Sequence, residues 1–81
     1  MKRECIELLI ENNREIEFTY IDKRYSITYY DDKRKKYISF AEFYKTPIDV
    51  SSVNELLKIK LDKKTLEEVF AKLPDENIDI F

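Results

Sequence analysis

Residues 15–30 read EIEFTYIDKRYSITYY, and this stretch decides most of the fold. Two runs, residues 15–21 and 24–30, alternate between apolar and polar side chains, and only Asp22 and Lys23 separate them. Alternation with a period of two is typical of a β-strand that is buried on one face. The stretch therefore predicts an antiparallel hairpin with a two-residue turn at Asp22-Lys23.

The register of this hairpin determines which side chains share the core. A turn at Asp22-Lys23 places Phe18 opposite Ile27 and Tyr20 opposite Tyr25. A slip of one residue would exchange the two faces, so the parity of the register is well determined. The turn itself fits less well, because Lys23 occupies a position where a positive φ favours glycine. The predicted apolar face carries Ile16, Phe18, Tyr20, Tyr25, Ile27 and Tyr29.

The residues that follow extend the hairpin into a three-stranded meander. Pairing Asp31 with Lys36 leaves a four-residue loop and continues the apolar face through residues 37–41. Thr46-Pro47 is expected to end the sheet, since proline has no N–H to donate to a neighbouring strand.

Helices are predicted on both sides of the meander. Residues 2–13 place apolar side chains at helical spacing and stop at Asn12-Asn13, where Asn tolerates a left-handed cap. Cys5 lies within this pattern and is expected to fill the core as a small apolar residue. Capping-box patterns at Ser52 and Thr65 predict two further short helices.

The whole chain is expected to form a single domain, residues 1–81, of the two-layer α+β class. Its predicted order is helix, three-stranded antiparallel meander, helix, helix (αβββαα). Pro74 ends the last helix, and residues 75–81 form an acidic tail whose alternating Ile78, Asp79 and Ile80 fit an extended docking segment.

Composition excludes several classes of chemistry. The chain has no His and no Gly, and its only cysteine is Cys5, so it lacks the usual near-neutral base, a phosphate-binding glycine loop and a disulfide framework. We expect no enzyme activity, no cofactor and no metal. The net charge of −2 does not indicate a nucleic-acid binder. No signal peptide or membrane-spanning run is recognised, so a cytoplasmic location without membrane contact is expected.

The predicted loop between the second and third strands is the first candidate site. Lys33, Arg34, Lys35 and Lys36 stand between Tyr30 and Tyr37, and cations beside aromatic rings suit phosphate contact and base stacking. The alternative is a solvated turn, since Asp31 and Asp32 cancel half of the local charge.

The polar face of the sheet is the second candidate. Tyr30 and Tyr37 share it with Glu15 and Glu17, and tyrosine brings a large contact area at low entropic cost. Acids distributed along the chain would allow the protein to imitate nucleic-acid phosphates and occupy a basic groove of a partner; they are Glu4, Glu7, Glu11, Glu15, Glu17 and those of the tail. The alternatives are an ordinary solvated sheet face and a homodimer formed through a sheet edge or Ile80-Phe81.

Two resemblances accompany these patterns. The run from Glu15 to Tyr44 and the segment Leu61 to Leu66 resemble small uncharacterised bacterial and phage proteins from AT-rich genomes, in which a glycine is often present near Lys63. The predicted order of elements is also similar to that of some anti-CRISPR proteins, which are small acidic inhibitors carried by phages. These resemblances imply a phage or mobile-element inhibitor whose protein partner is a host nuclease or its nucleic-acid channel.

The sequence therefore favours a non-catalytic protein-binding module. A nucleic-acid-binding domain that uses Lys33 to Lys36 is the second hypothesis, and a structural or dimerisation domain is the third.

Overall fold

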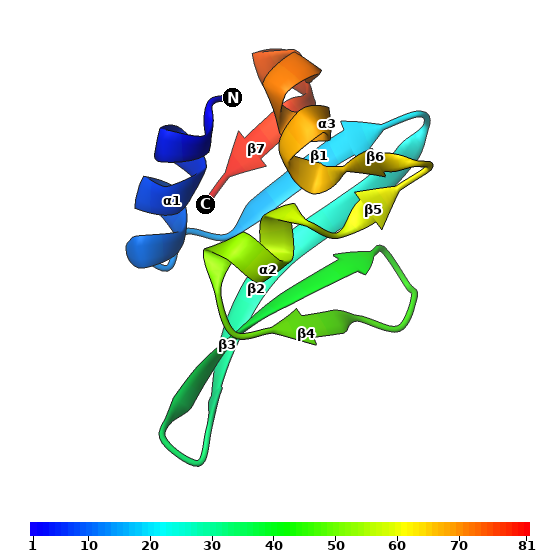
Figure 1. The fold of residues 1–81 in the computed structure, drawn as a ribbon. Helices are drawn as coiled ribbons and strands as arrows, with labels where there is room; N and C mark the ends of the chain where they lie inside the picture. The colour runs from blue at the N-terminus through cyan, green and yellow to red at the C-terminus, as the bar shows by residue number, and fades with distance from the viewer.

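A five-stranded antiparallel sheet forms one layer of the fold, and helices cover one of its faces (Figure 1). The computed structural model describes residues 1–81. The strands of this sheet are β1 (Ile16–Tyr20), β2 (Lys23–Asp32), β3 (Lys35–Glu42), β4 (Ile48–Val50) and β7 (Ile78–Ile80). The other elements are α1 (Arg3–Glu11), α2 (Val53–Leu57), the hairpin of β5 (Lys60–Leu61) and β6 (Lys64–Thr65), α3 (Leu66–Lys72) and the 3₁₀ turn η1 (Asp75–Asn77). The strand order is β4-β3-β2-β1-β7.

The first hairpin forms as predicted in its faces but not in its turn. The turn is Ile21-Asp22, with φ values of 47° and 62°, so both residues adopt the left-handed conformation of a type I′ turn. Phe18 consequently pairs with Tyr25 rather than Ile27. The register differs from the predicted one by two residues, and an even shift keeps every side chain on its predicted face.

The second hairpin confirms the predicted pairing and corrects the length of the loop. Asp31 pairs with Lys36, as expected, but the strands continue until Asp32 pairs with Lys35. Only Lys33-Arg34 remain as the turn, with φ values of 51° and 68°. The predicted four-residue loop is therefore a long ribbon closed by a two-residue turn.

The predicted order αβββαα is confirmed only in part. An α+β fold with helices and an antiparallel meander is present, but Pro47 does not end the sheet, because β4 follows it directly and pairs with β3. Residues 75–81 contribute β7, which pairs with β1. The meander therefore gains one strand on each side, and its central strands β1, β2 and β3 are all flanked by neighbours.

The core lies between the inner face of the sheet and the helices. Phe18 is at its centre, with ring centroids 5.2 Å from Tyr25 and 4.8 Å from Phe70 of α3. Such aromatic contacts add to the gain from burying apolar area. The buried side chains form one cluster: Ile6, Ile10, Ile16, Phe18, Tyr25, Ile27, Ile38, Phe40, Leu56, Leu57, Leu66, Val69, Phe70 and Leu73.

Cys5 is not part of this core, contrary to the sequence-based expectation. It is exposed, whereas its neighbour Ile6 is fully buried. Successive residues of a helix are about 100° apart around the axis, so Cys5 lies on a different side of α1 from the buried stripe. Leu8 is on this uncovered flank as well and is 60% exposed.

Local capping agrees closely with the sequence. Asn13 is left-handed at φ 56°, and the N–H of Arg14 donates to the carbonyl of Leu9, which closes α1 in the expected manner. Thr65 and Glu68 form a complete capping box at the start of α3. At α2, Ser52 accepts from the N–H of Glu55 as predicted.

Candidate functional site

The face of the sheet that points away from the helices is the main candidate surface, and we call it the open face. Its side chains alternate with the buried ones along each strand, and none of them is buried. Small or hydroxyl-bearing side chains dominate its middle, so the face is flat. The open face comprises Glu15, Glu17, Thr19, Arg24, Ser26, Thr28, Tyr30, Tyr37, Ser39, Ala41, Asp49 and Asp79.

Carboxylates outnumber cations on the open face. The register of β1 and β7 places Glu17 directly opposite Asp79, an arrangement in which like charges repel. Arg24 of β2 relieves this repulsion: its Nη2 is 3.3 Å from Oε1 of Glu17 and also forms an ion pair with Asp79. The hydrogen bond to Asp79, with a further one to Glu17, raises the pKa of Arg24. Two carboxylates thus share one guanidinium, and the cluster stays negative.

The predicted residues Tyr30 and Tyr37 lie together at one end of the open face. They face each other across β2 and β3, with ring centroids 5.2 Å apart and planes inclined by 20°. The hydroxyl of Tyr30 donates to Oδ2 of Asp49 at 2.8 Å. This hydrogen bond is the main cause that raises the pKa of Tyr30 to about 12. Asp49 therefore fixes the aromatic pair against the edge strand β4.

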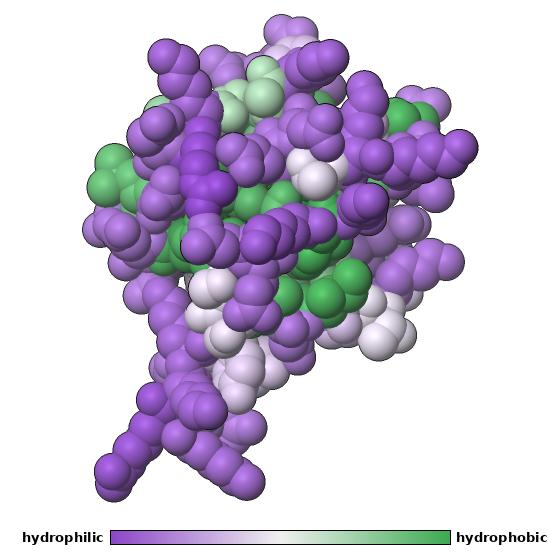
Figure 2. Space-filling model, viewed as in Figure 1, coloured by the Kyte–Doolittle hydropathy of each residue, from purple (hydrophilic) through white to green (hydrophobic).

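The basic segment occupies the end of the long β2–β3 hairpin, which projects from the body and is hydrophilic at its tip (Figures 1 and 2). Its four cations do not converge. Lys36 turns toward the helix side, where its Nζ lies 5.1 Å from the centroid of the Tyr29 ring and donates to the carbonyl of Ile10 at 3.5 Å. The other three cations, Lys33, Arg34 and Lys35, remain exposed.

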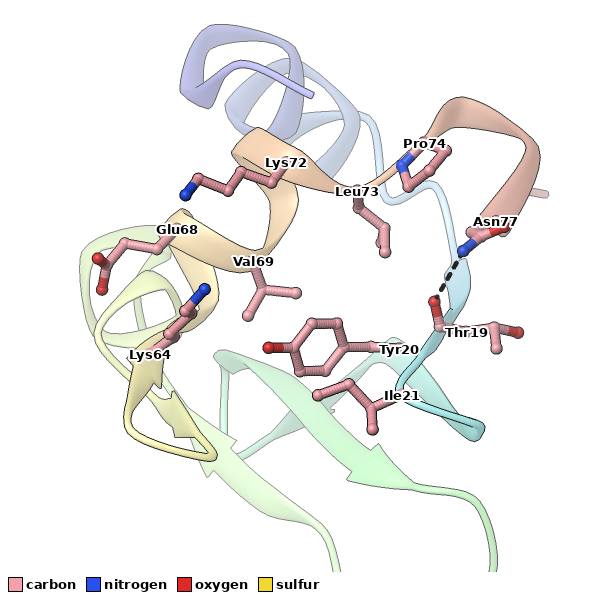
Figure 3. Close-up of a pocket in the computed structure, with 10 residues that line it drawn as sticks. All are labelled: Thr19, Tyr20, Ile21, Lys64, Glu68, Val69, Lys72, Leu73, Pro74 and Asn77. Atoms are coloured by element: carbon pink, nitrogen blue, oxygen red, sulfur yellow. Dashed lines mark hydrogen bonds between the residues drawn. The ribbon is translucent and has the colours of Figure 1, made fainter.

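A small pocket lies between α3 and the turn of the first hairpin (Figure 3). It has a volume of about 250 Å³, and Tyr20 and apolar side chains of α3 line its interior. The ammonium groups of Lys64 and Lys72 stand at its rim with Glu68 between them in sequence. Glu68 is already engaged, because its carboxylate accepts from the N–H and the hydroxyl of Thr65. This pocket is large enough for one side chain of a partner.

No group of three metal-binding side chains converges in the structure. The acids of the open face are spread over three strands, and Arg24 occupies the space between Glu17 and Asp79. No helix is long and apolar enough to cross a membrane. No family model, curated protein or solved structure matches the chain. Functional inference therefore depends on the geometry of these surfaces.

Sequence reasoning found Glu15, Glu17, Tyr30 and Tyr37 but missed the other charged members of the open face. Asp49 was missed because Pro47 was expected to end the sheet. Asp79 was placed in a tail, although its position between Ile78 and Ile80 is the alternation of a strand with one apolar face. That signal becomes decisive only when a pairing partner, β1, is known.

Proposed function

We propose that the chain is a non-catalytic protein-binding module whose open face binds a basic surface of a partner. The observation that carries the proposal is the excess of carboxylates on one face: Glu15, Glu17 and Asp79 lie toward one edge and Asp49 lies at the other, with Arg24 as the single guanidinium. An acidic face attracts a basic partner over a distance and disfavours nucleic acid directly.

The chemistry of the face supports recognition rather than turnover. Its centre is lined by Ser26, Thr28, Ser39 and Ala41, which leave the backbone accessible and impose little steric barrier to another surface. Tyr30 and Tyr37 add a rigid aromatic contact at one end, and aromatic residues are frequent anchors of protein interfaces. Half-exposed strands of this kind are an ordinary solution for solubility, so the charge pattern and not the exposure is the supporting feature.

Within this class we favour a phage or mobile-element inhibitor that occupies the nucleic-acid channel of a host nuclease, in the manner of anti-CRISPR proteins. Carboxylates held in rows on a sheet would take the places of backbone phosphates. Glu15 directly precedes β1 and Glu17 lies on it, and two residues of extended chain separate them by about 7 Å. Asp79 lies opposite Glu17 on the neighbouring strand β7.

An affinity capture from the native host, read by mass spectrometry, tests this proposal. The wild-type chain should retain a nucleic-acid-processing protein at near-stoichiometric yield. The double variant Glu15→Lys, Asp49→Lys should lose it, because it reverses two of the four charges of the face. Both positions lie outside the Arg24 cluster, so no ion pair is broken, and Asp49→Lys also removes the hydrogen bond from Tyr30. The matched control is Lys33→Glu, Lys35→Glu on the hairpin tip, which should keep the partner. Equal capture by the two double variants would refute the role of the open face.

Nucleic-acid binding through the hairpin tip is the second candidate, favoured by the exposure of Lys33, Arg34 and Lys35 on a projecting ribbon. This function would require an affinity that falls steeply with salt. It would also require the variant Lys33→Glu, Lys35→Glu to lose binding while Lys36, which packs on Tyr29, stays in place. Electrophoretic mobility shifts at two salt concentrations with single-stranded and duplex DNA would distinguish this function from binding by the open face.

A further inference from the structure

The two edges of the sheet are the three-residue strands β4 and β7. At one edge, β4 follows directly after Pro47 and ends in Ser51-Ser52 at the start of α2. At the other edge is β7, and like β4 it carries neither proline nor lysine, two residues that commonly blunt an exposed edge.

The hydrogen bonds between β1 and β7 determine which groups point outward. The N–H of Phe81 donates to the carbonyl of Glu15 at 2.8 Å, so residues 15 and 81 form a hydrogen-bonded pair. Because such pairs alternate along an antiparallel ladder, Asp79 also bonds to β1, and Ile78 and Ile80 direct their backbone groups away from it. The N–H of Ile78 is satisfied by the carbonyl of Asp75. Three groups remain: the carbonyl of Ile78 and both the N–H and the carbonyl of Ile80.

An apolar groove runs beside this free edge, on the helix side of the sheet. It lies between α1 and β7, has a volume of about 800 Å³ and is lined mainly by apolar side chains. Cys5 and Leu8 form its α1 wall, and Ile78 and Ile80 form its β7 wall. Leu8 is 60% exposed and Ile80 41%, and hydrophobic surface is visible beside α1 in Figure 2. The backbone edge and the groove are thus two parts of one vacant strand position.

We propose that an extended segment of a partner protein adds to β7 as a sixth strand, with apolar side chains in the groove and a lysine or arginine beside Asp79. Side chains of an added strand alternate between the two faces of the sheet. Residues next to Ile78 and Ile80 would point into the groove, while the residue between them would point to the open face and meet Asp79. The segment is therefore of the type apolar–basic–apolar. Backbone pairing with β7 supplies its affinity, and the groove and Asp79 supply its selectivity.

Charge distinguishes this occupant from a second copy of the chain. A symmetric β7–β7 pairing centred on Asp79 would place two aspartates opposite each other, which is unfavourable. Centring the pairing on Ile80 would leave only the groups of that residue to pair. In both arrangements, the α1 helices would approach along the flank that carries Leu8, with the exposed Glu4 and Glu11 beside it. The acidic surroundings therefore favour a basic segment over self-association.

This inference deepens the proposed function, since it names the kind of partner segment and the place where it binds. The test is to select random nine-residue peptides, displayed on phage, for binding to the full chain. The affinities of the enriched peptides, made synthetically, are then measured. Enriched sequences should alternate apolar and basic residues. Leu8→Glu should weaken the winning peptide about tenfold or more by placing a charge in the apolar groove. The matched control, Ile48→Glu, changes an apolar residue that is 49% exposed at the opposite edge and should leave the affinity unchanged.

Backbone pairing has a signature that other binding modes lack. N-methylation of the peptide backbone should lower the binding affinity about tenfold at one set of alternate positions, odd or even, and have little effect at the other set. The reason is that only every second N–H of the peptide faces β7. The amide of Ile80 should exchange slowly with solvent only in the complex, whereas that of Asp79 is protected in the free protein as well.

Several results would overturn the inference. These are failure to enrich alternating sequences, equal effects of methylation in both parities, or a dimer of the free chain that Leu8→Glu dissociates. The variant Glu15→Lys, Asp49→Lys should leave the winning peptide's affinity within about twofold, since neither residue adjoins β7's outer edge. For the wild-type chain, failure to capture a cellular partner although the peptide binds would refute the open-face function alone, and capture of a partner without any peptide binding would refute strand addition alone.

Discussion

Replacing Lys63 with glycine is expected to stabilise the fold. Lys63 is the second residue of the two-residue turn between β5 and β6 and has a φ of 72°. Its side chain is exposed and takes part in none of the salt bridges of the structure. The substitution therefore changes the backbone preference of this position with little loss of contact.

The magnitude follows from two opposing effects. A residue with a Cβ atom pays about 1–2 kcal/mol in the left-handed region, a cost that glycine avoids. Glycine also gives the unfolded chain more freedom, which offsets about 0.4–1 kcal/mol of that gain. The expected net stabilisation is about 1 kcal/mol, which corresponds to roughly 4–8 °C in the melting temperature of a domain of this size.

Urea unfolding followed by circular dichroism measures this effect. Lys63→Ala is the matched control, because it removes the same charge but keeps the Cβ atom and therefore the backbone cost. Lys60→Gly, in the adjacent strand β5, is the second control and should destabilise the protein by about 0.5–1 kcal/mol. The reasoning is refuted if Lys63→Gly unfolds at the same urea concentration as Lys63→Ala or at a lower one.

Four further outcomes are expected. Phe18→Ala should cost about 3–5 kcal/mol in the free energy of unfolding, because it empties the centre of the aromatic core, whereas Tyr44→Ala, at a fully exposed position, should be near neutral in the same urea experiment. Thr65→Ala should cost about 1 kcal/mol by removing the cap of α3. Backbone and side-chain hydrogen bonds from Thr65 lower the pKa of Glu68. The stabilisation of the folded state by ionised Glu68 is therefore complete above the usual carboxyl pKa and is lost as pH falls through the lowered pKa. The difference in stability between the wild type and Glu68→Gln should shrink in acid. Asp49→Ala should return the pKa of Tyr30 from about 12 toward 10 in a phenolate absorbance titration. The pKa of Tyr29, which burial raises to about 12, should not change. The stabilisation from the Tyr30 hydrogen bond is complete below pH 10 and disappears as pH rises through 12.

The parts of the fold that the sequence predicts well are those with local signals. Alternation determined the buried face of β1 and β2 even though the turn was displaced, because parity and not the turn decides which side chains are buried. Capping residues and the helical spacing of apolar side chains predicted α1, α2 and α3, because both signals depend on residues within one or two turns of the helix. The pairing of Asp31 with Lys36 was correct because charge and alternation agreed.

The turns were harder because the chain has no glycine to mark them. Three two-residue turns place both residues at positive φ: Ile21-Asp22, Lys33-Arg34 and Asp62-Lys63. Ile21 is the least expected of these, since a β-branched residue in this region is an outlier. A glycine near Lys63, as in the proteins that the segment resembles, would have marked the β5–β6 turn, yet the turn is tight without it. Tertiary packing of the strands on each side imposes a conformation that the turn residues do not favour.

The candidate surfaces depended on β7, and this strand could not be placed from its sequence. Its pairing with β1 joins segments about sixty residues apart, and three residues carry too little pattern to specify a partner strand. Without this pairing, Asp79 is one acid in a tail and Cys5 lies on a helix face that a core was expected to cover. Long-range pairing therefore determines both the acidic cluster of the open face and the groove beside α1.

The position of β7 bears on the proposed strand addition. Of its three residues, Ile78 is half-buried and Ile80 and Asp79 are exposed, so its own burial contributes little stabilisation. It is retained by pairing with β1 and by the ion pair between Asp79 and Arg24. One side chain of this strand reaches the open face, two line the groove, and the backbone between them faces solvent. A strand that is held at the edge by polar contacts and lies beside an unfilled apolar groove supports the proposal that β7 is a docking position.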